Sequence, residues 1–299
     1  MDVAVTGSSG LIGTKLVARL TAEGHRAVRV VRRRPEHGAD EIYWKPSAGE
    51  IDAPSFEGLD AVVHLAGAGI GDKRWSDARK KVLYSSRVDS TKLLADTLAG
   101  LDNGPGVFLS GSAIGFYGDR GEEELTESST PGDDFNAEIC INWEKAAAPA
   151  VEAGVRTVNL RTGIVLDPDG PFLGRQLPLF KLGLGGRMGS ADRWLSWISI
   201  DDEVDAIMFL LTADVAGPVN LTAPNPVRNG EFTDTIGRVL HRPTVLPVPM
   251  IGPKLLLGSE AVENLINSAK ILPTVLQAAG YDFHHRDIEP ALRAVLGKD

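Results

Sequence analysis

The sequence predicts an α/β protein with a Rossmann-type doubly wound parallel sheet, a smaller substrate-side portion and a helical C-terminal appendage. Two observations support this fold class. Short apolar runs alternate with segments of helical periodicity over the first 166 residues, and a glycine-rich turn separates the first run from the first helical segment. Because strands that alternate with helices are joined by crossover connections, we expect the strands to be parallel.

The first strand, turn and helix are expected within residues 3–24. Residues 3–5 are an apolar run, and apolar residues recur at helical spacing from 11 to 20. Residues 27–31 form a second β-branched run, which the basic residues 32–34 and Pro35 bring to an end. The turn between the first strand and the helix reads Thr6-Gly7-Ser8-Ser9-Gly10-Leu11-Ile12-Gly13.

Later elements continue the alternation. Short strands are expected around 42–44, a buried strand over 61–66, a long helix over 76–99 and a strand from 107 to 112. A helix around 137–151 and a strand from 155, running on towards 166, complete the predicted nucleotide-binding part. A further helix is expected near 201 and a late strand at 218–221.

These elements divide the chain into three expected parts. Residues 1–166 form the Rossmann domain, for which 195–225 are a second source of core strands. Residues 167–248 form the substrate-side portion, which is rich in Gly, Pro and Leu at its start, and 249–299 form a small helical domain.

Composition excludes several classes of partner. The 299 residues carry a net charge of -9, which opposes binding to nucleic acid or to an anionic membrane surface. No apolar stretch approaches the ~20 residues of a membrane span. The single cysteine, Cys140, allows no intrachain disulfide, and no Cys/His set has the spacing of a metal site. We therefore expect a cytoplasmic monomer or homodimer that acts on a small-molecule substrate.

The glycine turn has the physical properties of a dinucleotide site. Gly7 permits the tight reversal, Gly10 lets the backbone approach a pyrophosphate, and Gly13 lets the helix pack closely on the strand. The helix that begins near Leu11 directs free N–H groups and its positive dipole end towards the phosphates. The alternative is a glycine turn of purely structural origin.

The end of the second strand favours NADP(H) over NAD(H). An NAD site usually has an acidic residue about 20 residues after the glycines, to hold the ribose 2′-hydroxyl. This chain has Arg32 and Arg33 there, which can hold a 2′-phosphate through charge-assisted hydrogen bonds. Alternatively, the arginines form a solvated strand end.

Several motifs resemble the extended short-chain dehydrogenase/reductase superfamily, and more narrowly its atypical, sugar-nucleotide epimerase-like branch. The resemblance covers essentially the whole chain. It is carried by TGSSGLIG at 6–13, DAVVHLAG at 60–67, AGAGI at 66–70, RW at 74–75, Ser86-Arg87, Thr91, SGSAIGFYG at 110–118, Trp143-Glu144, LRTGIVL at 160–166, WISIDD at 197–202, Leu272-Pro273, AGYDF at 279–283 and Ala291-Leu292.

The resemblance implies roles for individual residues. Ser112 would match the catalytic serine of the superfamily; alternatively, it caps a strand-to-loop turn. Further residues are expected to bind the cofactor: Leu65, Ala66 and Gly67 beside its adenosine and phosphates, Ser110 and Gly111 beside its nicotinamide, and also Ser8, Ser9, Ile12, Arg87 and Arg161.

The chain departs from the superfamily at its proton-transfer pair. A tyrosine and a lysine four residues later normally act together, the lysine lowering the pKa of the tyrosine. If Glu144 marks the acidic position that follows this lysine, Asn136 stands at the tyrosine position and Cys140 at the lysine position. Cys140 lies on an apolar helical face, which favours a core residue over a nucleophile.

Other polar and aromatic residues are weighed as substitutes. Tyr117 is a candidate acid or base; alternatively, it is a packed aromatic whose hydroxyl is hydrogen-bonded. We expect Asp201 and Asp202 to cap the helix that follows, and His64 to be a satisfied core residue. The remaining candidates are an apolar pocket wall at Phe172, Leu179, Phe180, Trp194 and Trp197, which is alternatively core, and substrate-anion contacts at Arg175 and Arg187, which are alternatively surface charges.

These observations favour an NADP(H)-binding enzyme of the epimerase or reductase kind. It would transfer a hydride at C4 of the nicotinamide, to or from a small or nucleotide-linked carbonyl or alcohol. The missing tyrosine and lysine leave two alternatives open: a non-catalytic NADP(H)-binding regulator and a nucleotide-binding scaffold without a redox role.

Overall fold

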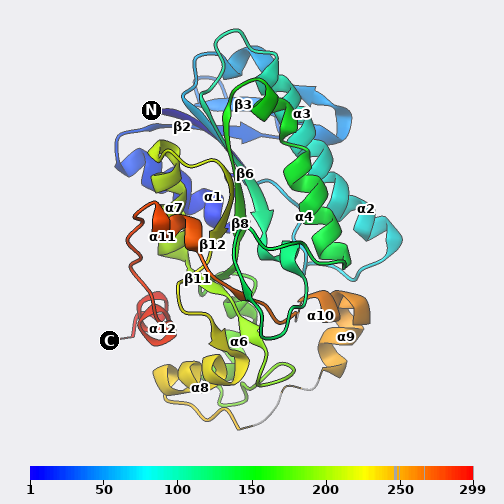
Figure 1. Ribbon diagram of the computed structural model, residues 1–299, viewed down its shortest axis with the longest axis vertical. Helices are drawn as coiled ribbons and strands as arrows, with labels where there is room; N and C mark the ends of the chain where they lie inside the picture. Colours follow the sequence, from blue (N-terminus) through cyan, green and yellow to red (C-terminus); the bar gives the residue numbers. More distant parts are fainter. Residues whose placement is uncertain (246–247, 249, 266, 299) are drawn as a thin grey trace.

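An eight-stranded sheet forms the centre of the computed structural model, which describes residues 1–245, 248, 250–265 and 267–298 (Figure 1). Its strand order is β12-β8-β6-β5-β1-β2-β3-β4. The strands are β1 (Asp2–Thr6), β2 (Arg26–Val31), β3 (Glu41–Lys45), β4 (Glu50–Ile51), β5 (Ala61–His64), β6 (Val107–Ala113), β8 (Arg156–Thr162) and β12 (Gly217–Leu221).

The pairing confirms the predicted doubly wound fold. Every neighbouring pair in this sheet is parallel except β3 and β4, which form an antiparallel edge. The chain builds outward from β1 to β2 and β3, then crosses to the other side of β1 to form β5. That reversal creates a switch point between β1 and β5, where ligands of open α/β sheets bind. The late strand expected near 218 is β12, which joins this sheet.

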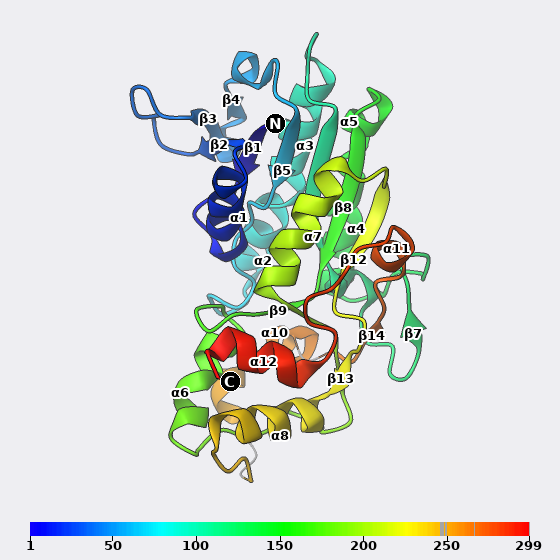
Figure 2. The same cartoon turned by 90° about the vertical axis from the view of Figure 1, so that its left-hand side faces the viewer.

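Helices cover both faces of the sheet, as Figures 1 and 2 show. One face carries α1 (Leu11–Ala22) and α7 (Ile200–Thr212); the other carries α3 (Val88–Ala99), α4 (Phe135–Lys145) and α5 (Ala148–Glu152). Because successive strand residues point to opposite faces, Val3 and Val5 lie in the core beneath α1 and α7, while Ala4 lies in the core beneath α3.

Two helices that the sequence predicts as continuous are interrupted. The segment expected at 76–99 is α2 (Asp77–Ser85) and then α3, with Ser86 and Arg87 between them. The hydroxyl of Ser86 accepts a bond from Ala68 N–H at 3.1 Å, which ties this break to the loop after β5. The segment expected at 137–151 divides between α4 and α5, and Pro149, which has no N–H to donate, lies in the first turn of α5.

The part of the chain that the sequence leads us to expect on the substrate side lies below the carboxyl ends of the strands in Figure 1. Its core contains Phe180 and Trp197, both almost completely buried, whereas Leu179 is exposed. The aromatic residues expected to line a pocket therefore belong largely to the core. Its elements are β9 (Ile164–Leu166), α6 (Leu173–Lys181), β10 (Trp194–Leu195), β11 (Trp197–Ser199), β13 (Val227–Arg228) and α8 (Asn229–Leu240).

The C-terminal region is helical, as predicted, and packs back on the rest of the protein. Ala291 and Leu292 of α12 share a core with α6 and α8 (Figure 2). The expected boundary at Pro249 lies outside the described residues. The elements are α9 (Ile251–Leu257), α10 (Ser259–Leu265), β14 (Lys270–Ile271), which pairs with β7 (Glu124–Leu125), α11 (Thr274–Ala278) and α12 (Ile288–Leu296).

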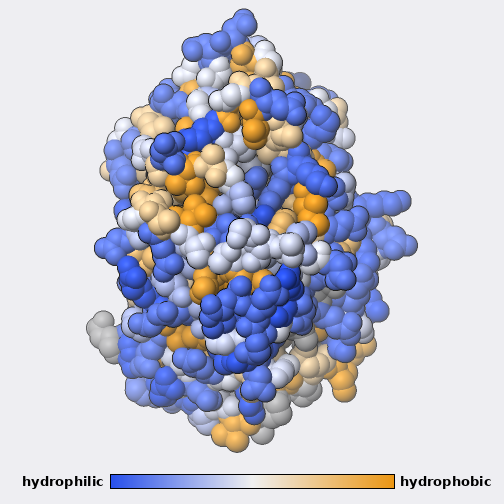
Figure 3. All heavy atoms as spheres, in the orientation of Figure 1, coloured by the Kyte–Doolittle hydropathy of each residue, from blue (hydrophilic) through white to orange (hydrophobic). Residues whose placement is uncertain are grey.

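The surface seen in Figure 3 is mostly hydrophilic, with apolar residues in separate patches. One apolar patch at the lower right coincides with α9, whose Ile251, Leu255 and Leu256 are exposed. None of the helices that the structure describes is both long and apolar enough to cross a bilayer.

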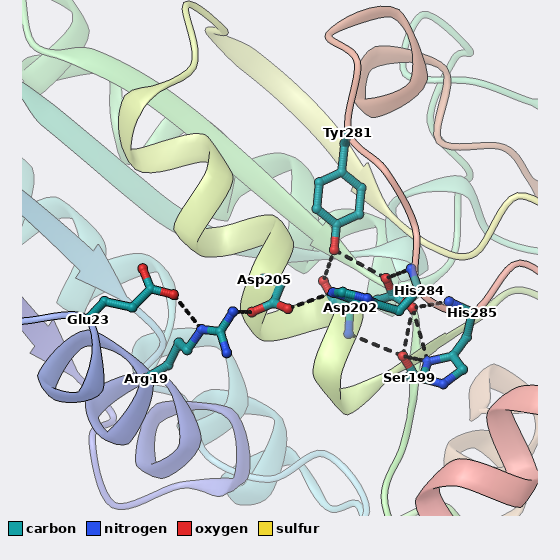
Figure 4. A network of polar contacts seen from close by, with 8 residues as sticks. All are labelled: Arg19, Glu23, Ser199, Asp202, Asp205, Tyr281, His284 and His285. Carbon is teal, nitrogen blue, oxygen red and sulfur yellow. Dashed lines mark hydrogen bonds and ion pairs between the residues drawn. The ribbon is translucent and has the colours of Figure 1, made fainter.

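A buried carboxylate attaches the C-terminal segment to α7 (Figure 4). Asp202 accepts hydrogen bonds from the backbone N–H groups of His284 and His285, at 2.8 and 3.0 Å, and from the hydroxyl of Tyr281. The expectation that Asp201 and Asp202 cap α7 is wrong, because Ser199 is the cap and its hydroxyl oxygen accepts from Asp202 N–H. The Asp202 carboxylate accepts from the Ser199 hydroxyl and from the C-terminal segment instead.

Candidate cofactor and active site

The glycine turn lies at the switch point and is as tight as its sequence implies. Gly7 has a φ of 65°, and a methyl group added there would lie 2.7 Å from the carbonyl carbon of Leu65. A methyl group on Gly13 would lie 2.2 Å from Gly7 O. Both glycines are therefore required by the close packing of the turn against α1 and the loop after β5.

Gly10 differs because its outer side is open. A methyl group added there would approach only Gly7 O, at 3.2 Å. Gly10 is also the N-cap of α1, where no side chain caps the helix and no acidic residue lies in the first turn. The first N–H groups of α1 therefore retain the capacity to bind an anion, which fits a dinucleotide pyrophosphate.

The loop after β5 is held beside this turn by Thr6. Its hydroxyl oxygen accepts from Leu65 N–H at 3.1 Å and from Ala66 N–H at 3.2 Å. Its own proton therefore goes to His64 Nδ1, at 2.7 Å. Burial lowers the pKa of His64 to about 3, so the imidazole is neutral. His64 is thus a satisfied core residue, as predicted, and it fixes the loop that carries Leu65, Ala66 and Gly67.

The arginines after β2 are not equivalent. The guanidinium of Arg33 bonds both carboxylate oxygens of Glu41, at 2.6 and 2.9 Å. Arg32 is exposed and has no ion pair with any residue that the structure describes. Of the two arginines expected to hold a 2′-phosphate, Arg32 is therefore the one without an ion pair, as is the exposed Arg34 beside it, while Glu41 is already paired.

Ser112, at the end of β6, belongs to a buried polar chain. Its hydroxyl donates to Glu144 Oε1 at 2.7 Å, and Glu144 receives Nε and Nη2 of Arg161 at 2.8 and 2.9 Å. The exposed fractions of the Arg161 and Glu144 side chains are only 4% and 13%. Glu144 therefore orients the Ser112 hydroxyl, and Arg161 compensates the negative charge of Glu144.

Tyr117 and Arg161 lie at the inner end of this chain. The Tyr117 hydroxyl donates to Asn220 Oδ1 and accepts from Arg161 Nη1, at 2.7 and 2.8 Å, and Nη1 also bonds Glu127 O. Tyr117 is completely buried. All three guanidinium nitrogens of Arg161 are thus occupied by protein groups, so the structure places Arg161 behind the site rather than open to a cofactor.

Asn136 and Cys140 lie together opposite the turn that follows β6. A methyl group added to Gly115 would lie 3.2 Å from Asn136 Cβ and 3.8 Å from Cys140 Sγ. Burial raises the pKa of the Cys140 thiol to about 12. Cys140 is therefore protonated at neutral pH and belongs to the core, as predicted.

Ser110 and Arg87 are two further residues that the sequence leads us to expect at the cofactor. The Ser110 hydroxyl is buried in the middle of β6, opposite the end of β5, and no hydrogen-bond partner lies among the described residues. Arg87 lies over the ring of Trp143, at 5.2 Å, and against Gly67. Ser8 of the turn is buried and Ser9 is exposed. The carboxyl ends of the neighbouring strands β1, β5 and β6 thus lie together at one site.

The two arginines expected near a substrate anion have separate surroundings. Arg175 bonds Gly71 O and Asp72, at 2.7 and 3.2 Å. Arg187 lies in the segment after α6, and its carbonyl accepts from Val248 N–H. Their roles stay predictions.

The strand order, the switch point and the glycine turn define the class: a dinucleotide-binding Rossmann protein of the short-chain dehydrogenase/reductase type. Residues 3–222 match the NAD dependent epimerase/dehydratase family, and residues 248–295 match a domain of unknown function, DUF1731. The chain belongs to the NAD dependent epimerase/dehydratase family.

Related proteins and structures extend over the whole chain. An epimerase family protein of Mycobacterium bovis is 43% identical, with 97% of this chain and 96% of the relative covered. An Arabidopsis thaliana homologue of SDR39U1, described as chloroplastic, is 38% identical over 99% of this chain and 87% of its own. The crystal structure of human SDR39U1 with NADPH has a TM-score of 0.90 at 31% identity, covering 99% of both chains.

The partners within the polar chain cannot be predicted from the sequence. Glu144 and Arg161 lie in separate motifs, and their pairing joins α4 to β8, which no local pattern reveals. Glu127 lies outside every motif of the sequence. Its carboxylate accepts from Asn220 N–H, Val275 N–H and Thr274 Oγ1, so it fastens α11 behind the site.

Proposed function

We propose that this protein is an NADP(H)-dependent oxidoreductase or epimerase that transfers a hydride to or from a small or nucleotide-linked carbonyl or alcohol. The proposal is carried by one observation. The uncapped helix at Gly10, the unpaired Arg32 and the oriented Ser112 all lie at the carboxyl ends of the strands. When bound, the cofactor supplies or accepts the hydride at C4 of its nicotinamide.

Different residues at the carboxyl ends of the strands bind different parts of the cofactor. The N–H groups at the start of α1 receive the pyrophosphate, and Arg32 receives the 2′-phosphate. The buried hydroxyl of Ser110 and the loop at Gly67 lie on the side of β1 that carries β5 and β6, which is where the nicotinamide half would bind. The NADPH in the crystal structure of human SDR39U1 supports the same choice of cofactor.

Ser112 is the proposed catalytic residue. In the oxidation direction, the substrate hydroxyl donates to Ser112 Oγ while Ser112 donates to Glu144 Oε1. The released proton therefore has a route to the carboxylate, and reduction uses the same path in reverse. Arg161 and Tyr117 act as positioning residues, because their polar atoms are occupied and the side chains are buried.

The proposal is tested by following the absorbance of NADPH with a library of carbonyl compounds. We expect turnover of at least one compound class, and a loss of roughly a hundredfold or more in kcat/KM for Ser112→Ala. Ser47→Ala, at an exposed serine, is the matched control. If Ser112→Ala retains full activity, Ser112 has no catalytic role.

The absence of tyrosine at 136 and lysine at 140 favours one alternative, a non-catalytic NADP(H)-binding regulator. It predicts tight NADPH binding with no turnover of any carbonyl or alcohol. Turnover that Ser112→Ala abolishes would exclude it.

A further inference from the structure

A basic segment follows the loop after β5. Six of the 31 Lys and Arg residues lie within residues 73–87, where Asp77 is the sole acid, although the whole chain has a net charge of -9. The segment contains α2 and the break before α3, and Figure 3 shows a hydrophilic surface at the right, where Figure 1 draws α2. This segment concentrates positive charge beside the proposed nicotinamide side of the site.

Arg87 directs its guanidinium towards this side. A methyl group added to Gly67 would lie 3.4 Å from Arg87 Cζ, and the guanidinium lies over the ring of Trp143. The same ring packs on Gly111, where a methyl group would lie 2.8 Å from Trp143 Cζ2. Arg87 is therefore separated from the residue before Ser112 by a single aromatic ring.

Arg79 reaches the same loop from α2. Its Nη2 donates to Gly69 O at 2.5 Å, and its buried Nε has no hydrogen-bond partner among the described residues. Burial lowers the pKa of Arg87, and the charge of Arg79 lowers it further. Two guanidinium groups thus share the loop that runs from Gly67 to Gly69.

Neither arginine has an ion pair with any residue in the described ranges, although Asp77 lies exposed in the first turn of α2, and two other nearby acids are already paired. Asp72 lies against Gly69 but forms its ion pair with Arg175, at 3.2 Å, and Glu260 of α10 pairs with Lys80. Burial of a guanidinium without a counter-charge is unfavourable, and it affects Arg87 and the Nε of Arg79. Arg79 and Arg87 therefore favour the binding of an anionic ligand at this loop.

We propose that Arg79 and Arg87 bind a carboxylate or phosphate group of the substrate. The proposal rests on the proposed function, because it assigns the cofactor phosphates to two other places, the start of α1 and Arg32. An anion held at this loop would place the rest of the substrate beside Gly111 and Ser112. The substrate class is then a carbonyl or alcohol that also carries a carboxylate or phosphate.

The test uses the full-length protein saturated with NADPH, so that the cofactor phosphate sites are filled. Inorganic phosphate, and separately malonate, is titrated at constant ionic strength against chloride, and binding is followed by the rise in Tm and by calorimetry. We expect Arg79→Gln to weaken the binding of the probe anions about tenfold. Lys81→Gln, which removes the same charge from an exposed position on α2, should leave it within twofold.

NADPH affinity, measured separately, distinguishes the outcomes. The proposal predicts that Arg79→Gln changes the NADPH Kd by less than about threefold, whereas a loss equal to that for phosphate would assign the pair to the cofactor and overturn it. Equal phosphate binding by Arg79→Gln and Lys81→Gln would also overturn it. If the wild-type protein binds no NADPH, the proposed function fails. The anion site is still supported in that case if Arg79→Gln, but not Lys81→Gln, loses phosphate binding.

Discussion

Removing Glu144 tests the buried polar chain behind Ser112. Its carboxylate receives two bonds from Arg161, at 2.8 and 2.9 Å, and one from Ser112 at 2.7 Å, with little access to water. Breaking such a buried pair from one side costs about 3–5 kcal/mol, because the remaining charge is left uncompensated. Arg161 retains bonds to Tyr117 and Glu127, so we expect Glu144→Ala to cost about 3 kcal/mol.

Urea denaturation measures this loss through the free energy of unfolding. Glu138→Ala, at an exposed acid on the same helix, is the control, and we expect it to cost under about 1 kcal/mol. Arg161→Met in the Glu144→Ala background should cost less than the two single changes add up to, since it removes the stranded charge. A loss under about 1 kcal/mol for Glu144→Ala, or strict additivity with Arg161→Met, would refute the reasoning.

Further predictions concern a buried acid, the glycine turn and the cysteine. Burial raises the pKa of Glu203 to about 8, so the wild type loses stability as pH rises from about 4.5 to about 8, and Glu203→Gln should gain several kcal/mol relative to it over that range. A stability difference that does not change between pH 5 and 8 in urea titrations would contradict this assignment. Gly10→Ala should leave the Tm within a few degrees but weaken NADPH binding at least tenfold, whereas Gly13→Ala should lower the Tm strongly, because its methyl group meets Gly7 O. Equal effects of the two substitutions on Tm would count against the open side of Gly10. The Cys140 thiol should resist alkylation in the native protein at pH 8 and react after unfolding, and rapid labelling of the native protein would show that it is accessible.

The sheet could be predicted because its signals are local. The run before Gly7, the runs at 27–31 and 61–66, and the turn itself each indicate a strand or a turn without reference to distant residues. The interruptions in the helices were missed for the opposite reason. Ser86 bonds the loop at Ala68, and that contact, which lies outside the helix, is absent from any periodicity of apolar residues.

The glycine turn and the arginines after the second strand could be recognised in the sequence by their spacing, and their role in binding a cofactor stays a prediction. The distinction between Arg32 and Arg33 was not visible, because it depends on Glu41 of the neighbouring strand. Arg161 was expected at the cofactor, yet tertiary contacts turn it towards Glu144. Side-chain partners across α4, β6 and β8 are set by packing, so only the structure reveals them.

We propose above all that the chain holds NADP(H) through Arg32 at the glycine-turn site. The most direct measurement compares the Kd of NADPH and NADH, by calorimetry, for the wild type, Arg32→Ala and Arg33→Ala. We predict that the wild type prefers NADPH by about tenfold to a hundredfold, that Arg32→Ala abolishes this preference, and that Arg33→Ala, whose side chain is paired with Glu41, largely retains it. Equal affinity of the wild type for both cofactors, or equal losses in the two variants, would contradict the account.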